Sequence, residues 1–309
     1  MARAGHIALT KHHGAGNDFL VTLDLPDAWH PTDAEVVALC HRRMGLGADG
    51  LIRVLAGRNG AHLAMDLRNS DGSTANMSGN GIRCMVQAAV GGGVVGPGPV
   101  TVATLGGERT VHYRAGQHGG PAVADVDMGP ITLGADLDIS EVAARITGSI
   151  PVAGSGEPLG WLRRVRTVDM GNRHLVLWGA PVPPGSVAPI GRALERSVPG
   201  GANVEFVSAG PRAGELELRV WERGAGETLA CGTGTCAAVA AVHAWGEGPG
   251  AMAVHNPGGT LVVALEAGGA RLTGPTRKVA DVSVDLTALA DQVACWDAPY
   301  RPATPAAGC

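Results

Sequence analysis

Two short glycine-rich segments hold the residue types in this chain that are best suited to chemistry. They are Ser78-Gly-Asn-Gly81 and Cys231-Gly-Thr-Gly234, and the small and apolar residues after them predict buried helices over about Asn80–Ala89 and Thr233–Trp245. The first N–H groups of a helix have no partner within it and lie at the positive end of its dipole. Because glycine lets an anion approach the backbone closely, each segment predicts a site for a carboxylate.

Ser78 and Cys231 stand directly before these helix starts. A thiol at a helix start has its pKa lowered, so we expect thiolate near neutral pH. If the two starts face each other across a cleft, the two side chains lie on opposite faces of a bound amino acid. One then removes the α-proton and the other returns a proton to the opposite face, while the N–H groups stabilise the enolate-like intermediate. This is the chemistry of a two-base epimerase.

Other kinds of site fit these segments less well. Taken alone, Cys231 is by default a small buried residue at a helix start. Neither Gly-x-Gly continues into a P-loop or a dinucleotide-binding fingerprint, and Cys231 and Cys236, five apart on one helix, are not adjacent zinc ligands. Pyridoxal phosphate needs a Schiff-base lysine, and Lys11 and Lys278 are the only lysines among 24 cationic residues. We therefore expect no metal and no cofactor.

An internal repeat connects the two segments. Asn17 and Asn172 lie in similar surroundings 155 residues apart, and Ser78 and Cys231 are 153 residues apart. Between these pairs, residues 47–50 resemble residues 201–204 at an offset of 154. Three matches in one order predict two homologous halves, each with one helix start. We place the boundary near residues 115–125, where the glycine-rich segment 115–121 is typical of a linker.

Composition excludes several classes of protein. The chain has 309 residues, of which 45% are hydrophobic and 17% charged, so it can bury a core. Its net charge of -4 gives no basic surface for nucleic acid, and no apolar run approaches a membrane span. The six cysteines form no C-x-x-C pair, and the first residues lack the apolar stretch of a signal peptide. We therefore expect a cytoplasmic protein without nucleic-acid or membrane partners.

Each half is predicted to mix helices with short strands. A helix over Thr32–Met44, capped by Thr32 or Asp33, has apolar residues along one side. Alternating or β-branched runs predict strands at His6–Thr10, Phe19–Leu23, Gly50–Leu55, Leu63–Leu67, Val100–Ala103, Val165–Asp169, Leu175–Leu177, Val204–Val207, Leu216–Trp221 and Leu261–Leu265.

At its glycine-rich segments the chain resembles diaminopimelate epimerase, a cofactor-independent family of the proline racemase-like superfamily. The matching segments are Lys11–Phe19, Gly45–Gly50, Arg68–Ser73, Gly79–Cys84, Gly171–His174 and Glu222–Cys236. The resemblance implies an α+β fold of two pseudo-symmetric domains, each a mixed β-barrel-like sheet around a central helix, with the active site in the cleft between them. It implies an N-terminal half of residues 1–122 plus about 275–309 and a C-terminal half of residues 123–274.

The resemblance also implies roles for single residues. Cys231 is implied as a catalytic thiol, and Ser78 occupies the position of the other catalytic group. The N–H groups of Gly79, Asn80, Gly232 and Thr233 are implied to bind the reacting α-carboxylate. A set of polar side chains is implied to hold the distal end of diaminopimelate: Asn17, Asn69, Asn172, Asn203, Glu222 and Arg223.

The implied function is epimerisation of LL-diaminopimelate to meso-diaminopimelate in lysine and peptidoglycan precursor synthesis. The partner is then a small-molecule substrate, diaminopimelate or a similar amino acid, and a homodimer is left open. The family has a second catalytic cysteine where this chain has Ser78, so one half-reaction should be slowed. Ser78 is then a change made to trap a complex, a slower natural variant, or a sign of one-thiol chemistry. The alternatives on the same fold are a lyase or dehydratase, a racemase of another amino acid, and a non-catalytic amino-acid-binding protein.

Overall fold

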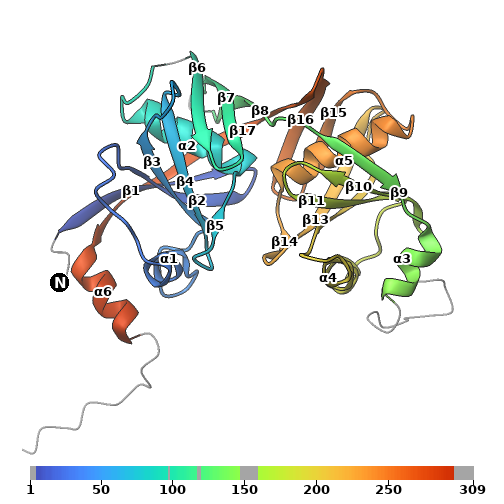
Figure 1. Ribbon diagram of the computed structural model, residues 1–309, viewed down its shortest axis with the longest axis horizontal. Coiled ribbons are helices and arrows are strands. Elements are labelled where there is room, and N and C mark those ends of the chain that lie inside the picture. The colour runs from blue at the N-terminus through green and yellow to red at the C-terminus, as the bar shows by residue number, and fades with distance from the viewer. Residues whose placement is uncertain (1–4, 97, 117–119, 147–158, 296–309) are drawn as a thin grey trace, which may run out of the picture.

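Two lobes of similar build form the molecule, each with a helix enclosed by strands (Figure 1). The computed structural model describes residues 5–96, 98–116, 120–146 and 159–295. The middle of the predicted linker and the residues after 295 lie outside the described residues. Within the described part of the chain, no helix is long and apolar enough to cross a membrane.

The first lobe is a closed ring of strands around α2 (Gly79–Gly91). Pairing runs from β1 through β2, β3, β4, β6, β7, β8 and β17 back to β1. The strands are β1 (His6–Gly14), β2 (Asn17–Leu23), β3 (Gly50–Ala56), β4 (Leu63–Asn69), β6 (Gly98–Thr104), β7 (Gly107–Arg114), β8 (Ala122–Asp127) and β17 (Gly269–Asp285), with the short β5 (Thr74–Ala75) beside β4. Ile82, Met85 and Val86 of α2 are fully buried, because strands surround the helix on most sides.

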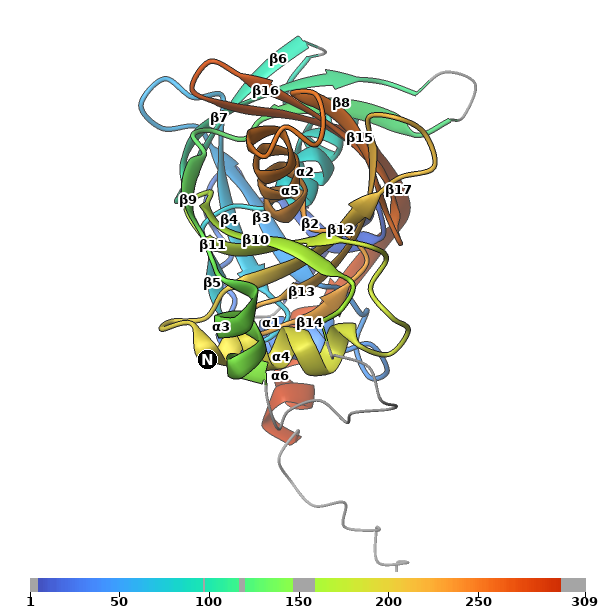
Figure 2. The ribbon, with the colours of Figure 1, turned by 90° about the vertical axis from the view of Figure 1, so that its right-hand side faces the viewer.

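The second lobe arranges its strands in a similar order around α5 (Gly232–Ala244), and Figure 2 shows both enclosed helices. Its strands are β9 (Thr132–Asp136), β10 (Leu162–Asp169), β11 (Arg173–Gly179), β12 (Asn203–Ala209), β13 (Glu215–Glu222), β14 (Gly226–Thr228), β15 (Ala251–Asn256) and β16 (Gly259–Glu266). Phe19 pairs with Gly50 between parallel strands β2 and β3, and His174 pairs with Asn203 between parallel strands β11 and β12. The two lobes therefore repeat the same pair of parallel strands, as the internal repeat predicts, but this register makes Gly50 correspond to Asn203, one residue before the Val204 of the predicted match.

Four further helices lie outside the strand rings in the described part of the chain. They are α1 (Asp33–Cys40), α3 (Ile139–Ile146), α4 (Val187–Ser197) and α6 (Leu286–Cys295). Helices α1 and α4 are the crossovers of the two parallel strand pairs, as such pairs require. Strand β17 begins beside β16 of the second lobe and ends beside β1 of the first, and α6 then packs near α1. The residue boundaries of the two halves, at 122–123 and about 275, stay a prediction.

The predicted helix Thr32–Met44 is too long. It begins as expected, with Thr32 and Glu35 forming a reciprocal capping box, but it ends at Cys40. The following chain turns back, so that Leu46 N–H donates to Leu39 C=O and Ala48 N–H donates to Cys40 C=O. A Cβ at Gly45 would lie 2.0 Å from Ala38 O, so this return depends on glycine.

Candidate active site

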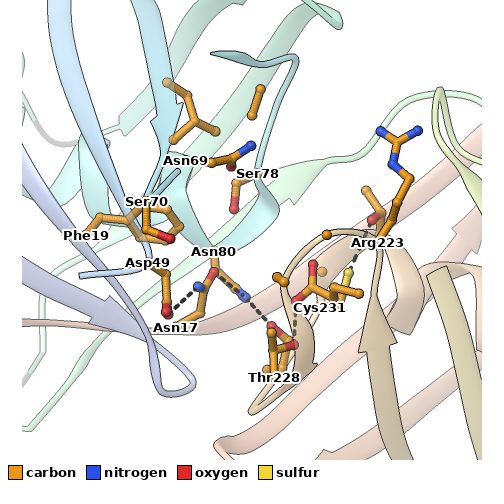
Figure 3. Close-up of a pocket in the computed structure, with 18 of the residues that line it drawn as sticks. Asn17, Phe19, Asp49, Asn69, Ser70, Ser78, Asn80, Arg223, Thr228 and Cys231 are labelled. Atoms are coloured by element: carbon orange, nitrogen blue, oxygen red, sulfur yellow. Dashed lines mark hydrogen bonds between the residues drawn. The ribbon is translucent and has the colours of Figure 1, made fainter. Parts of the chain in front are cut away.

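The two enclosed helices meet end to end at their first residues. A Cβ on Gly232 would lie 3.2 Å from the Cα of Gly79, so the absence of a side chain at Gly232 allows this close approach. The meeting point forms the floor of a cleft of about 790 Å³ between the lobes, shown in Figure 3. Of the predicted site residues, the structure places these along the cleft: Asn17, Asn69, Ser78, Gly79, Asn80, Asn172, Glu222, Arg223, Cys231, Gly232 and Thr233.

Ser78 and Cys231 cap the two helices in the same way, from opposite walls of the cleft (Figure 3). The Ser78 Oγ accepts from Gly81 N–H at 3.0 Å, and the Cys231 Sγ accepts from Gly234 N–H at 3.4 Å. The next N–H groups donate to the carbonyls of Ser78 and Cys231. The first two N–H groups of each helix have no intrahelical partner, so four N–H donors are available where the two helix starts meet.

Asn80 ties the two helix starts together. Its Nδ2 donates to Asn17 Oδ1 at 3.2 Å and to Ala230 O, in the other lobe, at 3.0 Å. Its Oδ1 accepts from Arg83 at 2.7 Å, and Arg83 also donates to Gly79 O at 2.8 Å. Arg83 is fully buried, and burial lowers its pKa to about 10. The start of α2 is therefore held rigidly against the second lobe.

The first-lobe wall contains charged residues that sequence reasoning missed. Asp49 Oδ2 accepts from Asn17 Nδ2 at 2.8 Å and thereby orients this amide. Arg42 lies 2.5 Å from Asp49 and 2.6 Å from Asp18, which closes a small ion-pair network. Both Arg42 and Asp49 line the cleft. Asp49 could have been selected from the sequence, because it lies in the repeated segment 47–50.

Cys231 and Glu222 lie together on the second-lobe wall. Burial raises the pKa of the Cys231 thiol well above its usual value, and the negative charges of Glu222 and Glu205 raise it further. The Thr233 hydroxyl and the Gly234 N–H act in the opposite direction, but more weakly. The predicted lowering of this pKa is therefore wrong for the folded chain, since burial and two carboxyl groups outweigh the helix start.

Glu222 has a position that suits proton transfer. Its carboxyl group accepts from the Thr228 hydroxyl and hydrogen-bonds to the Cys231 side chain. Burial raises the pKa of Glu222, although both hydrogen bonds lower it. Two adjacent acids with raised pKa values titrate as a pair and can share one proton.

Asn203 does not line the cleft, unlike the other predicted site residues. Its Oδ1 accepts from the Arg223 N–H at 2.8 Å, so it holds the turn that presents Arg223 at the rim. Behind Cys231 lies a second feature that sequence reasoning missed, a fully buried pair in which His174 Nδ1 is 2.7 Å from Glu205 Oε1. His174 belongs to the segment 171–174 already singled out, but its partner on β12 could be recognised only from strand register.

Comparisons with known proteins agree with this geometry. The fold is shared with a hydroxyproline epimerase of Agrobacterium vitis, at a TM-score of 0.67 and 17% identity over 93% of this chain and 94% of that one. A phenazine biosynthesis protein of the PhzF family from Bacillus anthracis has a TM-score of 0.68 at 14% identity, over 91% of this chain and 99% of that one. The chain therefore has the two-lobed fold that these two proteins share.

Sequence comparison identifies the family within this class. Residues 9–134 and 166–279 match the family model of diaminopimelate epimerase. The diaminopimelate epimerase of Streptomyces coelicolor is 39% identical over 90% of this chain and 96% of its own length. That of Thermobifida fusca is 39% identical over 90% of this chain and 98% of its own length. The chain belongs to the diaminopimelate epimerase family.

Proposed function

We propose that this chain epimerises diaminopimelate, converting the LL form to the meso form by moving a proton at one α-carbon. The observation that carries the proposal is the close approach of Gly232 to Gly79, which brings the two helix starts together. Each start has a capping side chain, Ser78 or Cys231, on its own side of that position. The family match supports the choice of substrate.

The N–H groups of Gly79, Asn80, Gly232 and Thr233 hold the α-carboxylate in this proposal. As the α-proton leaves, negative charge develops on the carboxylate, and these fixed donors stabilise it more strongly than in the ground state. Asn17, Asn69, Asn172 and Arg223 line the same cleft and hold the distal amino-acid end in this proposal, and Asn203 supports Arg223 from behind.

Cys231 performs the proton transfer on one face. Passing its proton to Glu222 produces a thiolate, which can take the α-proton from the substrate carbon. On the other face the Ser78 Oγ must return or remove a proton, and an alcohol is a far weaker acid than a thiol. We therefore infer that exchange through Cys231 is faster than complete epimerisation.

The proposal is tested by following meso- and LL-diaminopimelate in heavy water with the unaltered chain, Ser78→Cys and Cys231→Ser. The unaltered chain should exchange the α-proton mainly with retention and epimerise slowly. Ser78→Cys should raise the epimerisation rate by about 100-fold or more, since a thiol replaces an alcohol as the acid. Cys231→Ser is the matched control, because it retains the cap and should abolish both exchange and epimerisation.

Other outcomes would assign another function. Keto acid and ammonia from a β-substituted amino acid would indicate a one-thiol lyase. Turnover of a smaller amino acid in place of diaminopimelate would indicate a different racemase. If Ser78→Cys binds diaminopimelate and yet neither exchanges its α-proton nor epimerises it, the chain is a binding protein and the proposal is wrong.

A further inference from the structure

Arg83, in the second turn of α2, places a positive charge inside the first lobe, where its side chain is 0% exposed. The guanidinium donates to Asn80 Oδ1 at 2.7 Å, to Gly79 O at 2.8 Å and to Pro275 O at 3.3 Å. All three acceptors are uncharged, and no carboxylate among the residues that the structure describes acts on Arg83. Burial of a charge without an opposite charge costs free energy, so this arrangement requires an explanation.

A second buried arginine of the same lobe, Arg53 on β3, is treated differently. It is 4% exposed, and its guanidinium donates to Asp24, Asp27 and Asp66. Three carboxylates therefore balance the charge of Arg53 within the folded chain. The first lobe can provide carboxylates for a buried arginine, and it provides none for Arg83.

Glycines make the space that the Arg83 guanidinium occupies. A Cβ at Gly14, the last residue of β1, would lie 3.0 Å from Arg83 Nη2, and a Cβ at Gly274 of β17 would lie 2.9 Å from the same atom. Pro275, next to Gly274, supplies one of the three acceptor carbonyls. Two strands thus close around the planar group and hold its charge at a fixed place behind the first turn of α2.

The peptide group between Gly79 and Asn80 lies between this charge and the meeting point of the helix starts. Its C=O accepts from Arg83, and the N–H of a trans peptide points in the opposite direction. That N–H belongs to Asn80 and is one of the two at the start of α2 without a partner in the helix. Because a hydrogen bond from a cation polarises the peptide group, Arg83 makes this N–H a stronger donor.

The second helix start has no charge of its own. The repeat that matches Ser78 with Cys231 matches Arg83 with Cys236, which is also buried. The ionisable groups that act on Arg83 are Cys84 and Cys236, and burial raises their pKa values to about 11 and about 12, so both thiols are neutral at pH 7. The positive charge of Arg83 opposes this rise at Cys236, on the other helix. One cation therefore acts on both helices.

We propose that Arg83 supplies the fixed positive charge of the carboxylate site, and that its counter-ion is the α-carboxylate of the bound amino acid. The negative charge on this carboxylate grows as the α-proton leaves, and a cation that is already in place stabilises it without rearrangement. Arg83 acts through the peptide group of Gly79 and Asn80, so it is a positioning residue. The inference takes the place of the α-carboxylate from the proposed function and holds for any amino acid bound there.

The experiment compares Arg83→Lys, Arg83→Gln and Arg83→Met with the unaltered chain. Lysine and glutamine can each donate a hydrogen bond to Gly79 O, but only lysine is charged, and methionine does neither. By calorimetry, Arg83→Lys should bind meso-diaminopimelate within about threefold of the unaltered chain, whereas Arg83→Gln and Arg83→Met should bind about 30-fold more weakly. At saturating substrate in heavy water, these two variants should also exchange the α-proton about tenfold more slowly, because the carboxylate is more negative in the transition state.

The order of the variants separates charge from hydrogen bonding. Equal impairment of Arg83→Lys and Arg83→Gln would show that Arg83 only holds the backbone, and an Arg83→Gln variant as good as the unaltered chain would show no role at all; either result overturns the proposal. Arg58→Gln is the control, since it removes an exposed charge after β3 and should change neither affinity nor exchange. If no chain exchanges the α-proton but the affinities follow the expected order, the proposed function fails and the role of Arg83 stands.

A measurement on the unaltered chain covers the case in which the variants do not fold. Nitrogen-15 spectra of the arginine side chains at pH 7 should show a charged guanidinium at Arg83 without ligand. Adding meso-diaminopimelate should move the Arg83 signals and leave those of Arg53 in place, because Arg53 already has its carboxylates. A neutral Arg83, or Arg83 signals that do not respond to the bound ligand, would refute the proposal.

Discussion

Ser78 and Cys231 have one structural role and differ in chemistry. Each accepts a hydrogen bond from the N–H three residues ahead, so each can be replaced by the other without loss of its helix cap. As proton-transfer groups they differ greatly in acidity, because an alcohol is a far weaker acid than a thiol. The surroundings of the two residues add to this difference in proton-transfer chemistry, since Cys231 has Glu222 and Thr233 beside it. From the proposed roles of these two residues we therefore expect asymmetric catalysis at this site, although the backbone is nearly symmetric.

Asn203 allows a test of whether a residue outside the cleft supports substrate binding by holding Arg223 in place. Asn203→Ala removes the acceptor for the Arg223 N–H, a bond of 2.8 Å, without changing the cleft lining. We expect meso-diaminopimelate to bind about fivefold more weakly by calorimetry, the scale of one hydrogen bond. Asn203→Asp keeps the acceptor and should bind within about twofold of the unaltered chain. Equal affinity of Asn203→Ala and the unaltered chain would refute this role.

At the scale of elements, the site consists of two helix starts that touch. Helices α2 and α5 are enclosed by strands, and they approach each other at their first residues. Asn80 spans this contact from one lobe to the other. The close approach of the two helix starts therefore depends on the absence of a side chain at Gly232.

Gly232→Ala tests this contact. The added methyl group would lie 3.2 Å from Gly79 Cα and 3.1 Å from Leu272 Cδ2, so the helix starts must separate by a few tenths of an ångström. We expect meso-diaminopimelate to bind about tenfold more weakly, because the N–H groups of the two separated helix starts can no longer all reach the same carboxylate. Gly91→Ala is the matched control, since it adds a methyl group to the last turn of α2 with no atom within 4 Å. If both variants bind equally well, the helix starts do not define the site.

At the scale of the molecule, the parts that could be predicted are those with a local or repeated signal. All of the predicted strands lie within observed strands, and the repeat located both enclosed helices. Strand β17 was missed, because Gly274 and Pro275 interrupt its pattern although the strand continues through them. Glu205 and the raised pKa of Cys231 were missed because they depend on which strands pack together, and no local pattern records that packing.

Buried thiols make the stability of the whole molecule sensitive to alkaline pH. Burial raises the pKa of Cys40 to about 12, of Cys84 to about 11 and of Cys236 to about 12. In the unfolded chain these thiols ionise from about pH 8.5, whereas the folded chain keeps them protonated. Their contribution to stability is thus fully present below that pH and is lost as the pH rises toward 11. Each thiol should lower the free energy of unfolding by about 1.4 kcal/mol per pH unit in this window.

Urea unfolding with a reductant present, repeated from pH 7 to 10.5, measures this slope. Cys236→Ala should be less stable at pH 7, because it leaves a small cavity in α5, but its stability should fall less steeply above pH 9. The difference in slope between the two chains should approach the value for one proton, since a single buried thiol has been removed. Parallel curves for the two chains would show that Cys236 ionises as readily in the folded state as in the unfolded state, and that its burial carries no such cost.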